Sequence, residues 1–361
     1  MHKGVNPRRI TGALAAMTIA AGGIAAFPGT AAATDRPAVT LDQRVVTITG
    51  TPDRDVIRIT VDANRLAIDF GFDGTVDAQF RRSTFDQVRV LGAGGDDGIG
   101  LTGAGEAPVT IAGGAGDDGL GAVGHIGETG DGDAPTVING NGGRDGIFAA
   151  TPGPVALLGG PGNDVVDGGG AGVGLELVAL GDGNDRFRSS LNAFVGPRTD
   201  IVDGGTGTDS LEMEGTFATE GLSLSADAGR LVVNHDFHDR IDADNVETVS
   251  YLGLGGLDGG DAIAVNDLSG TDVQRFTNLG TNHDGSAPNN TPDTLTVRGT
   301  DGVDHITVAS SGTDITVTGL TPTVSLRGVE PEDFLRIETL AGNDVVDSRG
   351  LAPGLVHLLA L

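Results

Sequence analysis

Residues 113–121 read Gly113-Gly114-Ala115-Gly116-Asp117-Asp118-Gly119-Leu120-Gly121, a glycine-rich run that leads into an acidic and then an apolar residue. The same nine-residue pattern, Gly-Gly-x-Gly-x-Asp-x-apolar-x, occurs six times between residues 92 and 212. The other clean copies run from Gly159 to Asp167 and from Gly204 to Glu212. Looser copies run from Gly92 to Gly100, from Gly140 to Phe148 and from Leu180 to Arg188. Isolated copies further along the chain contain Asp261 and Asp344.

The residue types in this pattern favour calcium. Calcium takes six to eight oxygen ligands from carboxylates and backbone carbonyls. A glycine-rich turn can direct several carbonyl groups at one ion because glycine adopts positive φ without a steric penalty. The aspartate at the sixth position adds a carboxylate. The predicted metal ligands are the aspartates Asp97, Asp118, Asp145, Asp164, Asp185, Asp209, Asp261 and Asp344, together with the turns that begin at Gly113, Gly159 and Gly204.

Apolar residues bracket every copy in the array. The eighth position is always apolar, and so is the residue two places before the motif. The first set comprises Ile99, Leu120, Ile147, Val166, Phe187 and Leu211. The second set comprises Val90, Ile111, Ile138, Leu157, Val178 and Val202. This arrangement predicts a strand with a buried face on each side of every turn.

The spacing of the motif aspartates predicts a stacked solenoid. They occupy positions 97, 118, 145, 164, 185 and 209, at intervals of 21, 27, 19, 21 and 24 residues. Such periods are typical of solenoids, in which no repeat buries its apolar face alone. One turn per period carries the motif, and variable segments such as 128–133, 168–174 and 192–198 fill the opposite corner. We therefore expect an all-β parallel β-roll or β-helix, with calcium in one column between the carbonyls of one turn and the carboxylate of its neighbour.

The alternative interpretation is that these runs form flexible linkers or ordinary β-turns. Six copies in phase, each between apolar residues, favour the repeat. Stacked strands lie about 4.8 Å apart, so the motif carboxylates would repel one another unless a cation neutralised them. The sequence predicts an array that is loose without calcium and ordered at millimolar calcium.

Composition agrees with this interpretation and excludes several partners. Glycine accounts for 62 of 361 residues, and the acids are 40 Asp with only 10 Glu. The bases are 21 Arg and the single Lys3, for a net charge of −28. So acidic a chain disfavours nucleic acids and anionic membranes as partners. The absence of cysteine excludes disulfides and a lipid-modified cysteine.

Residues 1–33 have the organisation of a secretion signal. A positive start that includes Arg8 and Arg9 precedes the apolar stretch 10–26, and Ala31-Ala32-Ala33 forms a small-residue cleavage site. The glycines and proline within and after the apolar stretch disfavour the alternative, a membrane anchor. We expect a cleaved signal, used by either the general or the twin-arginine route, and an extracellular protein of net charge −31 without a further membrane span.

Strand patterns also occur outside the array. Residues 50–61 resemble residues 299–308. We expect 34–87 to cap the solenoid, 88–215 to form the calcium-binding array, 216–298 to be irregular and β-rich, and 299–361 to form a second strand segment with one further repeat. Residues 354–361 predict a strand, and a following turn would fall near residue 365, 21 residues after Asp344. This spacing favours a fragment of a longer protein over an end that caps the roll by another route.

The array resembles secreted bacterial proteins with hemolysin-type (RTX) calcium-binding repeats. The close resemblance covers residues 88–215, roughly a third of the chain. It implies a parallel β-roll that binds calcium between successive turns, with ligand roles for the six motif aspartates. The chain departs from that family in three ways. The motif occupies one corner only, Arg144 and Arg186 stand beside predicted ligands, and the signal is N-terminal where family toxins and proteases use a C-terminal one.

The expected function is calcium binding in a structural or adhesive role at a cell surface or on an extracellular polymer, without catalysis. The sequence lacks His-Glu-x-x-His, Gly-x-Ser-x-Gly, a phosphate loop and a cysteine nucleophile. His235 and His238 fall on opposite faces of a strand, so we interpret them as structural and solvent-exposed. The competing class is a catalytic or non-catalytic part of a β-helix polysaccharide lyase or epimerase, or a piece of a larger RTX protein. Scattered arginines and a single tyrosine disfavour the lyase.

Overall fold

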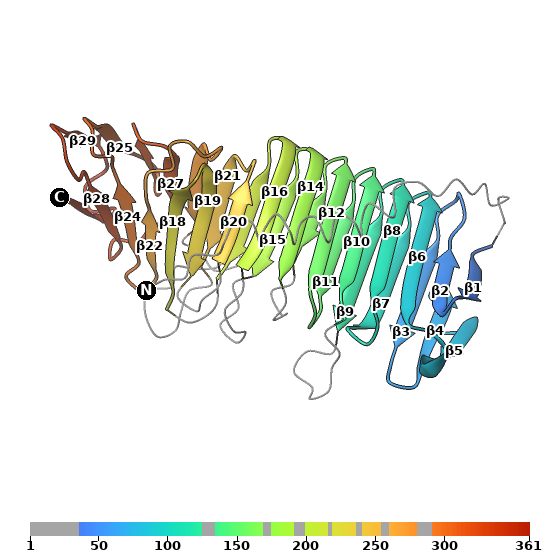
Figure 1. The fold of residues 1–361 in the computed structure, drawn as a ribbon. Helices are drawn as coiled ribbons and strands as arrows, with labels where there is room; N and C mark the ends of the chain where they lie inside the picture. Colours follow the sequence, from blue (N-terminus) through green and yellow to red (C-terminus); the bar gives the residue numbers. More distant parts are fainter. Residues whose placement is uncertain are drawn as a thin grey trace.

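The protein is an elongated two-sheet solenoid in the computed structural model (Figure 1). The structure describes residues 36–124, 134–168, 175–190, 199–215, 219–235, 240–253, 260–279 and 291–361. The chain passes from one sheet to the other and back in successive coils, and most neighbouring strands are parallel. The predicted all-β parallel roll or helix is therefore confirmed. The predicted signal, two of the variable corner segments (128–133 and 192–198) and most of the third lie outside the described residues.

Each sheet has 15 strands. In spatial order, sheet A contains β1 (Ala38–Asp42), β2 (Val45–Thr49), β6 (Gln87–Gly94), β8 (Val109–Ala115), β10 (Thr136–Gly142), β12 (Val155–Pro161), β14 (Glu176–Gly183), β16 (Thr199–Gly207), β20 (Arg240–Asp244), β19 (Arg230–His235), β18 (Gly221–Asp227), β22 (Ala262–Val265), β24 (Thr294–Arg298), β28 (Phe334–Glu338) and β30 (His357–Ala360).

Sheet B faces sheet A across the core. In spatial order, it contains β5 (Ala78–Arg81), β4 (Arg65–Phe70), β3 (Val56–Val61), β7 (Gly98–Ala104), β9 (Gly119–Gly124), β11 (Gly146–Ala150), β13 (Val165–Asp167), β15 (Arg186–Ser190), β17 (Ser210–Glu214), β21 (Thr248–Leu252), β23 (Arg275–Leu279), β27 (Thr323–Arg327), β26 (Asp314–Thr318), β25 (His305–Ser311) and β29 (Val345–Gly350). A 3-10 turn at Arg82–Thr84 is the one helical element of the described residues.

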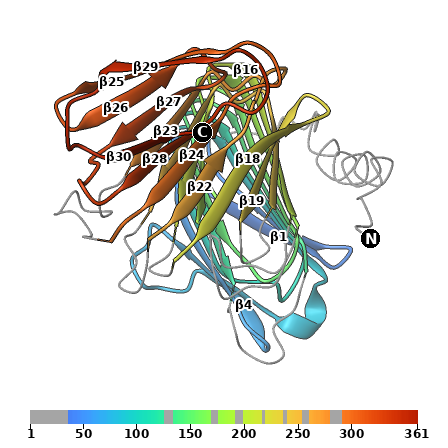
Figure 2. The ribbon, with the colours of Figure 1, turned by 90° about the vertical axis from the view of Figure 1, so that its left-hand side faces the viewer.

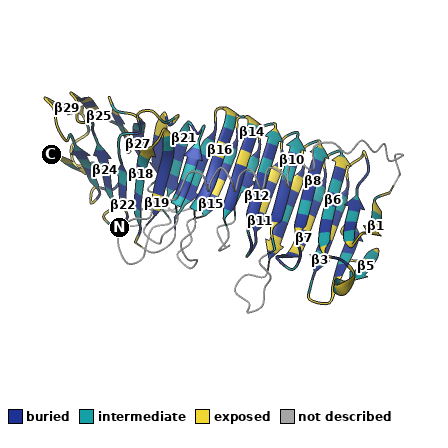
Figure 3. Cartoon of the chain, in the orientation of Figure 1, coloured by how far each residue is buried: buried dark blue, intermediate teal, exposed yellow. Residues whose placement is uncertain are grey.

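The core lies between the two sheets as thin layers of aliphatic side chains. All twelve apolar residues that bracket the motif are at most 3% exposed, so the predicted strand phase is confirmed on both sides of every turn. Buried and more exposed residues alternate along the strands (Figure 3). One continuous core extends from Val46 in β2 to Val356 just before β30. Because the core is unbroken, the sequence segments predicted outside the array share the two sheets with it.

The motif turns connect sheet A to sheet B and break the ladder of sheet A at a fixed point. Between β8 and β10, Ala112 pairs with Asn139 and Gly114 with Asn141, but Gly113 and Gly140 are not paired. The same interruption recurs between β6 and β8, β12 and β14, and β14 and β16. Pairing resumes at the next residue and continues for two or three residues before the chain turns the corner. The first motif residue is therefore a local interruption of regular pairing inside the strand.

Antiparallel strands interrupt the coils in three places. At the N-terminal end of the solenoid, β1 covers β2 and the β4–β5 pair covers β3. Figure 2 shows the solenoid along its axis from the C-terminal end. β18, β19 and β20 form an antiparallel meander inside sheet A, and β25, β26 and β27 form another inside sheet B. The sequence predicted strands here but not these hairpins, because period-two alternation carries no information on strand direction.

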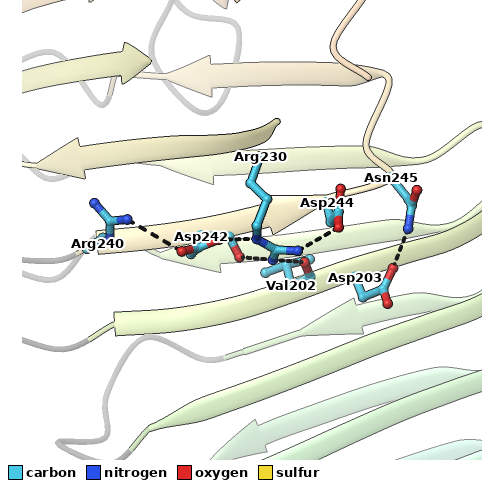
Figure 4. Close-up of polar contacts among 7 residues, drawn as sticks. All are labelled: Val202, Asp203, Arg230, Arg240, Asp242, Asp244 and Asn245. Atoms are coloured by element: carbon cyan, nitrogen blue, oxygen red, sulfur yellow. Dashed lines mark hydrogen bonds and ion pairs between the residues drawn. The ribbon is translucent and has the colours of Figure 1, made fainter. Parts of the chain in front are cut away.

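An arginine joins the first meander to the end of the motif array. Arg230 on β19 forms ion pairs with Asp242 and, at 2.6 Å, with Asp244, both on β20 (Figure 4). It also donates to the carbonyl oxygen of Val202 on β16, at 3.4 Å. The side-chain amide of Asn245 donates to Asp203 Oδ1 at 2.8 Å. These contacts span three neighbouring strands and hold the meander against the last motif coil.

Candidate functional site

The six motif aspartates form one continuous stack at a corner of the solenoid. Each of them directly precedes a strand of sheet B. The backbone N–H of each donates to Oδ1 of the next, at 2.7–2.8 Å from Asp97 through Asp209. The side chains point inward and all six residues are at most 3% exposed. We call this stack the acid ladder; its members are Asp97, Asp118, Asp145, Asp164, Asp185 and Asp209.

Two further acids extend the ladder, and the sequence analysis missed both as members. The N–H of Asp55, before β3, donates to Asp97 Oδ1 at 2.8 Å. At the other end, the N–H of Asp209 donates to Oε2 of Glu247 at 2.7 Å. Asp55 could have been found from the similarity between residues 50–61 and 299–308. Glu247 has no motif around it, and only the stacking of β21 on β17 brings it to the corner.

The fifth motif position forms a second, outer ladder that runs the opposite way. The N–H of Asp117 donates to Asp96 Oδ1 at 2.9 Å, and the N–H of Arg144 to Asp117 Oδ1 at 2.8 Å. Asn163 and Asn184 accept in the same manner in later coils. An amide serves as well as a carboxylate here, so the outer ladder needs an oxygen atom and not a charge.

The two arginines beside predicted ligands point away from them. Arg144 is exposed whereas Asp145 is buried, because the chain alternates inward and outward through the end of the turn. Arg186 is the first residue of β15 and forms an ion pair with Glu212 on β17 at 3.2 Å. Neither guanidinium group lies inside the corner with the acid ladder.

The second carboxylate oxygen of every ladder member has no hydrogen-bond partner. Oδ2 is buried and unsatisfied in Asp97, Asp118, Asp145, Asp164, Asp185 and Asp209. In five of the six it faces the first glycine of its own motif, whereas the motif of Asp185 begins with Leu180. At five of these coils, Oδ2 and the carbonyl oxygen of the matching residue in the following coil both lie within 3.0 Å of the position that a Cβ would take; the glycines are Gly92, Gly113, Gly140, Gly159 and Gly204. Two electron-rich oxygens therefore converge on one small space in coil after coil.

Two turns without the motif provide an internal comparison. Oδ2 of Asp55 accepts the N–H of Thr51 at 2.5 Å, and Oδ2 of Asp304 accepts the N–H of Thr300 at 2.8 Å. Both acids otherwise resemble ladder members, since each donates its own N–H to an aspartate of the next coil. In the motif turns the residue that corresponds to Thr51 has positive φ, as Gly114 does with 127°. We call the turns of Asp55 and Asp304 closed, because a backbone N–H of the turn satisfies Oδ2. In the motif turns Oδ2 has no such donor.

Burial makes the ladder carboxylates hard to ionise. The pKa of Asp164 is raised to about 7, chiefly by burial; the N–H of Asp145 opposes the shift, and neighbouring carboxylates add to it. The pKa is raised to about 6 for the same main reason at Asp97, Asp145 and Asp209. Burial also raises the pKa of Asp118 and Asp185. Between about pH 6 and pH 7, Asp97, Asp145, Asp164 and Asp209 are therefore partly protonated.

The residue types present suit calcium, but the described side chains alone supply too few ligands. Carboxylate and carbonyl oxygens are the ligands that calcium prefers. Within the described ranges, no three His, Asp or Glu side chains surround one point. Carbonyl groups of the stacked turns would therefore supply most of the six to eight oxygens. The aspartates from the isolated copies lie outside the ladder: Asp261 precedes β22 at the opposite corner, and Asp344 precedes β29 and stacks on Asp304.

A second buried acidic cluster surrounds Asp261. The hydroxyl of Tyr251 donates to Glu220 Oε2 at 2.6 Å and lies 3.2 Å from Asp261 Oδ2. His235 Nε2 lies 3.5 Å from Glu220 Oε1, and its side chain is 1% exposed. The prediction that His235 is solvent-exposed was wrong, because the meander turns that face of β19 toward the core. Burial raises the pKa of Asp261 to about 6. His238 lies outside the described residues.

Replacing Tyr251 by phenylalanine tests this cluster. The ring still fills the core, but Glu220 and Asp261 lose the hydroxyl that they share. A buried polar group left without its partner costs about 1–3 kcal/mol, so we expect the urea midpoint to fall accordingly. Tyr251→Ala, which also removes the ring, should cost more. A phenylalanine variant as stable as the parent would show that the two carboxyl groups do not depend on this donor.

Comparisons with known proteins add no family to these observations. No family model, no curated protein and no solved structure matches the chain. In the described part of the chain, no helix has the length and hydropathy of a membrane span.

Proposed function

We propose that the six motif turns bind calcium in a column, and that the protein is a secreted, calcium-stabilised solenoid with a structural or adhesive role and no catalytic activity of its own. Calcium would neutralise the acid ladder and link each turn to the next. Secretion follows from the signal-like residues 1–33, and extracellular calcium is abundant enough for sites with dissociation constants of roughly 10⁻⁴–10⁻³ M.

One observation carries this proposal. In closed turns such as that of Asp55 a backbone N–H satisfies Oδ2, whereas in the six motif turns Oδ2 is buried without a partner. A buried carboxylate that keeps an unsatisfied oxygen is costly unless a proton or a cation binds it. A carbonyl oxygen lies close to Oδ2 in the closed turn of Asp55 as well, so the missing donor is what distinguishes the motif turns, and a cation that prefers oxygen ligands would take its place.

Binding calcium would couple to folding. The ligand oxygens come from different coils, so a column of ions exists only when the coils are stacked. The binding free energy then becomes part of the folding free energy. Such coupling suits a protein that crosses a membrane unfolded at low calcium and orders outside the cell.

Calorimetric calcium titration of Asp118→Asn beside Asp117→Asn tests the proposal. Asp118 belongs to the acid ladder, and asparagine keeps the Oδ1 that accepts from Asp97 while it removes the charge. Asp117 is exposed in the outer ladder, where Asn163 already serves in another coil. We expect Asp118→Asn to bind fewer calcium ions than the parent and Asp117→Asn to bind the same number.

The same two variants distinguish a ladder that binds calcium from one that is only protonated. If the acids simply stay protonated, neither the parent nor Asp117→Asn should release heat when calcium is added. In Asp118→Asn the new side-chain amide could then donate to the carbonyl of Gly140 as a protonated acid would, and this variant should be at least as stable as the parent. Absence of calcium binding in the parent would overturn the proposal and leave an acid ladder that clamps the coils alone.

A further inference from the structure

The outer face of sheet B carries a slot with a glycine floor. Gly98 and Gly100 on β7 and Gly119 and Gly121 on β9 alternate with buried residues, so their Cα atoms face outward. A cavity of about 590 Å³ lies over them, lined also by Arg58 and Phe72 among others. At Gly100 and Gly121 no atom lies within 4 Å of the position of a Cβ. We call this feature the glycine slot.

Side chains rise on both sides of the glycine slot. In one row across the sheet, Arg58 on β3 is level with Gly100, Gly100 with Gly121, and Gly121 with Phe148 on β11. These strands lie side by side (Figure 1). Three strand spacings separate Arg58 from Phe148, or about 14 Å. The slot is therefore wide enough for a single extended chain, and the outward side chains of Thr102 and Val123 line one end of it.

Phe72, at the edge of the slot, has an unfavourable backbone conformation and an exposed ring. It is 62% exposed, and its φ is +58°. A bulky residue in the left-handed region is strained, and an exposed phenyl ring gains nothing from burial. Flanking Gly71 and Gly74 would tolerate such a turn, yet a phenylalanine occupies it. Strain of this kind collects where a side chain serves a ligand.

The slot is also lined by a cationic side chain, that of Arg58, although the protein is strongly acidic. The guanidinium of Arg58 lies over the ring of Phe72, 4.9 Å from its centroid. That stacking leaves the N–H groups in the guanidinium plane free to bind an anion. Arg58 forms no ion pair with a carboxylate among the described residues, although the chain has a net charge of −28. An aromatic ring and an arginine thus meet at one side of a flat floor.

We propose that the glycine slot binds an anionic glycan, with a sugar ring stacked on Phe72 and its carboxylate or sulfate bound by Arg58. The glycine floor would let the glycan chain approach the backbone closely. This inference rests on residues outside the acid ladder and does not depend on calcium as a ligand.

Other polymers fit the slot less well. A peptide strand would need free backbone groups, but β3, β7 and β9 already pair with one another and present a face, not an edge. A nucleic acid needs a row of cations along its phosphate backbone, and among the described residues Arg58 is the one basic residue that lines the slot. A glycan offers apolar ring faces for Phe72 and regularly placed anions for Arg58.

Calorimetry with short oligosaccharides on the full chain, at millimolar calcium, tests the proposal. The probes are a galacturonate hexamer, a sulfated hexamer and a neutral malto-hexaose. We expect binding of one or both anionic oligomers, the comparison between them identifying the anion, and at least tenfold weaker binding of the neutral one, since charge-assisted hydrogen bonds are worth about 1.5–3 kcal/mol. No binding of either anionic probe by the folded parent would overturn the proposal.

Variants locate the site. Gly121→Leu fills the slot, and Ser250→Leu adds the same side chain at an outward position of β21 as the matched control. We expect the first to abolish binding and the second to leave it unchanged. Arg58→Gln should weaken binding of the anionic probe roughly tenfold or more. Equal binding by the parent and Gly121→Leu would place the glycan elsewhere and overturn the proposal.

Phe72→Gly separates a ligand-binding role from a structural one. Glycine relieves the positive φ, so we expect this variant to melt at or above the temperature of the parent. It should nevertheless bind the anionic oligomer several-fold more weakly, because ring stacking is lost. A variant that melts lower and binds as well as the parent would show that Phe72 stabilises the loop and serves no ligand.

Discussion

Gly140→Ala is expected to destabilise the solenoid strongly, whereas Gly142→Ala, two residues further along β10, is expected to cost little. A Cβ on Gly140 would fall within 3.0 Å of Asp145 Oδ2 and of the carbonyl oxygen of Gly159. Both groups would have to shift, although Asp145 is buried and the carbonyl belongs to the next coil; among the six motif coils, only that of Asp185, with Leu180 at this position, is built around a side chain there. Overpacking of this kind costs about 1–3 kcal/mol. At Gly142 a Cβ meets no atom within 4 Å, so the cost should stay within about 0.5 kcal/mol.

Urea denaturation of both variants, with and without calcium, provides the measurement. Both variants carry a Gly→Ala change, so the effect on the entropy of the unfolded chain is the same in the two. Neither glycine has positive φ. The proposed metal site adds a second readout, because a displaced Asp145 should bind calcium less well. Equal midpoints for the two variants would mean that the corner adapts easily, and that the first glycine is not needed to seat the carboxylate.

The sequence predicted the repeating part of the fold well because two periodicities coincide. The glycine turns recur in phase, and apolar residues such as Ile111 and Leu120 alternate correctly on both sides of each turn. Burial of one face then fixes which residues point inward. The stack of six aspartates follows from parallel strands in register, and the structure brings the six together as expected.

The remaining features depend on contacts that no local pattern encodes. Glu247 joins the ladder only because β21 stacks on β17. His235 is buried because an antiparallel meander places β19 between β18 and β20. The glycine slot arises from the register of β3, β7 and β9, which brings together residues that are far apart in the sequence. Long-range register decides all three, and it is fixed by the assembled sheets.

The acid ladder and its closed counterparts suggest how the motif acquires function. The turn of Asp55 seats an inward aspartate and satisfies both of its oxygens. The motif turn keeps the same inward aspartate and the same hydrogen bond to Oδ1, but it removes the donor to Oδ2. The change leaves Oδ2 without a donor, which would lower the stability of the empty turn and favour whatever can bind that oxygen. A proton and a calcium ion would then compete for the same position.

This competition gives a second prediction with a large effect: stability should depend on pH in opposite ways with and without calcium. The pKa of Asp164 is raised to about 7, and those of Asp97, Asp145 and Asp209 to about 6, from 3.8 in the unfolded chain. Between about pH 4 and pH 7 the folded chain therefore keeps protons that the unfolded chain has lost. In EDTA, the free energy of unfolding should fall as the pH rises through this range.

Calcium should reverse that loss above pH 7. It replaces the protons, and each occupied site adds about 1.4 kcal/mol when free calcium is ten times the dissociation constant. Six sites would then raise the thermal midpoint by many degrees at pH 8, whereas at pH 5 protons hold Asp97, Asp145, Asp164 and Asp209, and calcium should change the midpoint less. Thermal unfolding from pH 5 to pH 8, with EDTA or with calcium, measures both curves.

Asp164→Asn is the control for this experiment, because it removes the group with the most raised pKa and keeps an oxygen for the N–H of Asp145. Its EDTA curve should be shallower than that of the parent by about one proton. A parent curve in EDTA that stays flat from pH 5 to pH 8 would mean that the ladder ionises without cost, which contradicts the buried, unsatisfied Oδ2 atoms. If stability falls as the pH rises and calcium does not restore it, the acid ladder is stabilised by protons and the proposed calcium sites are ruled out.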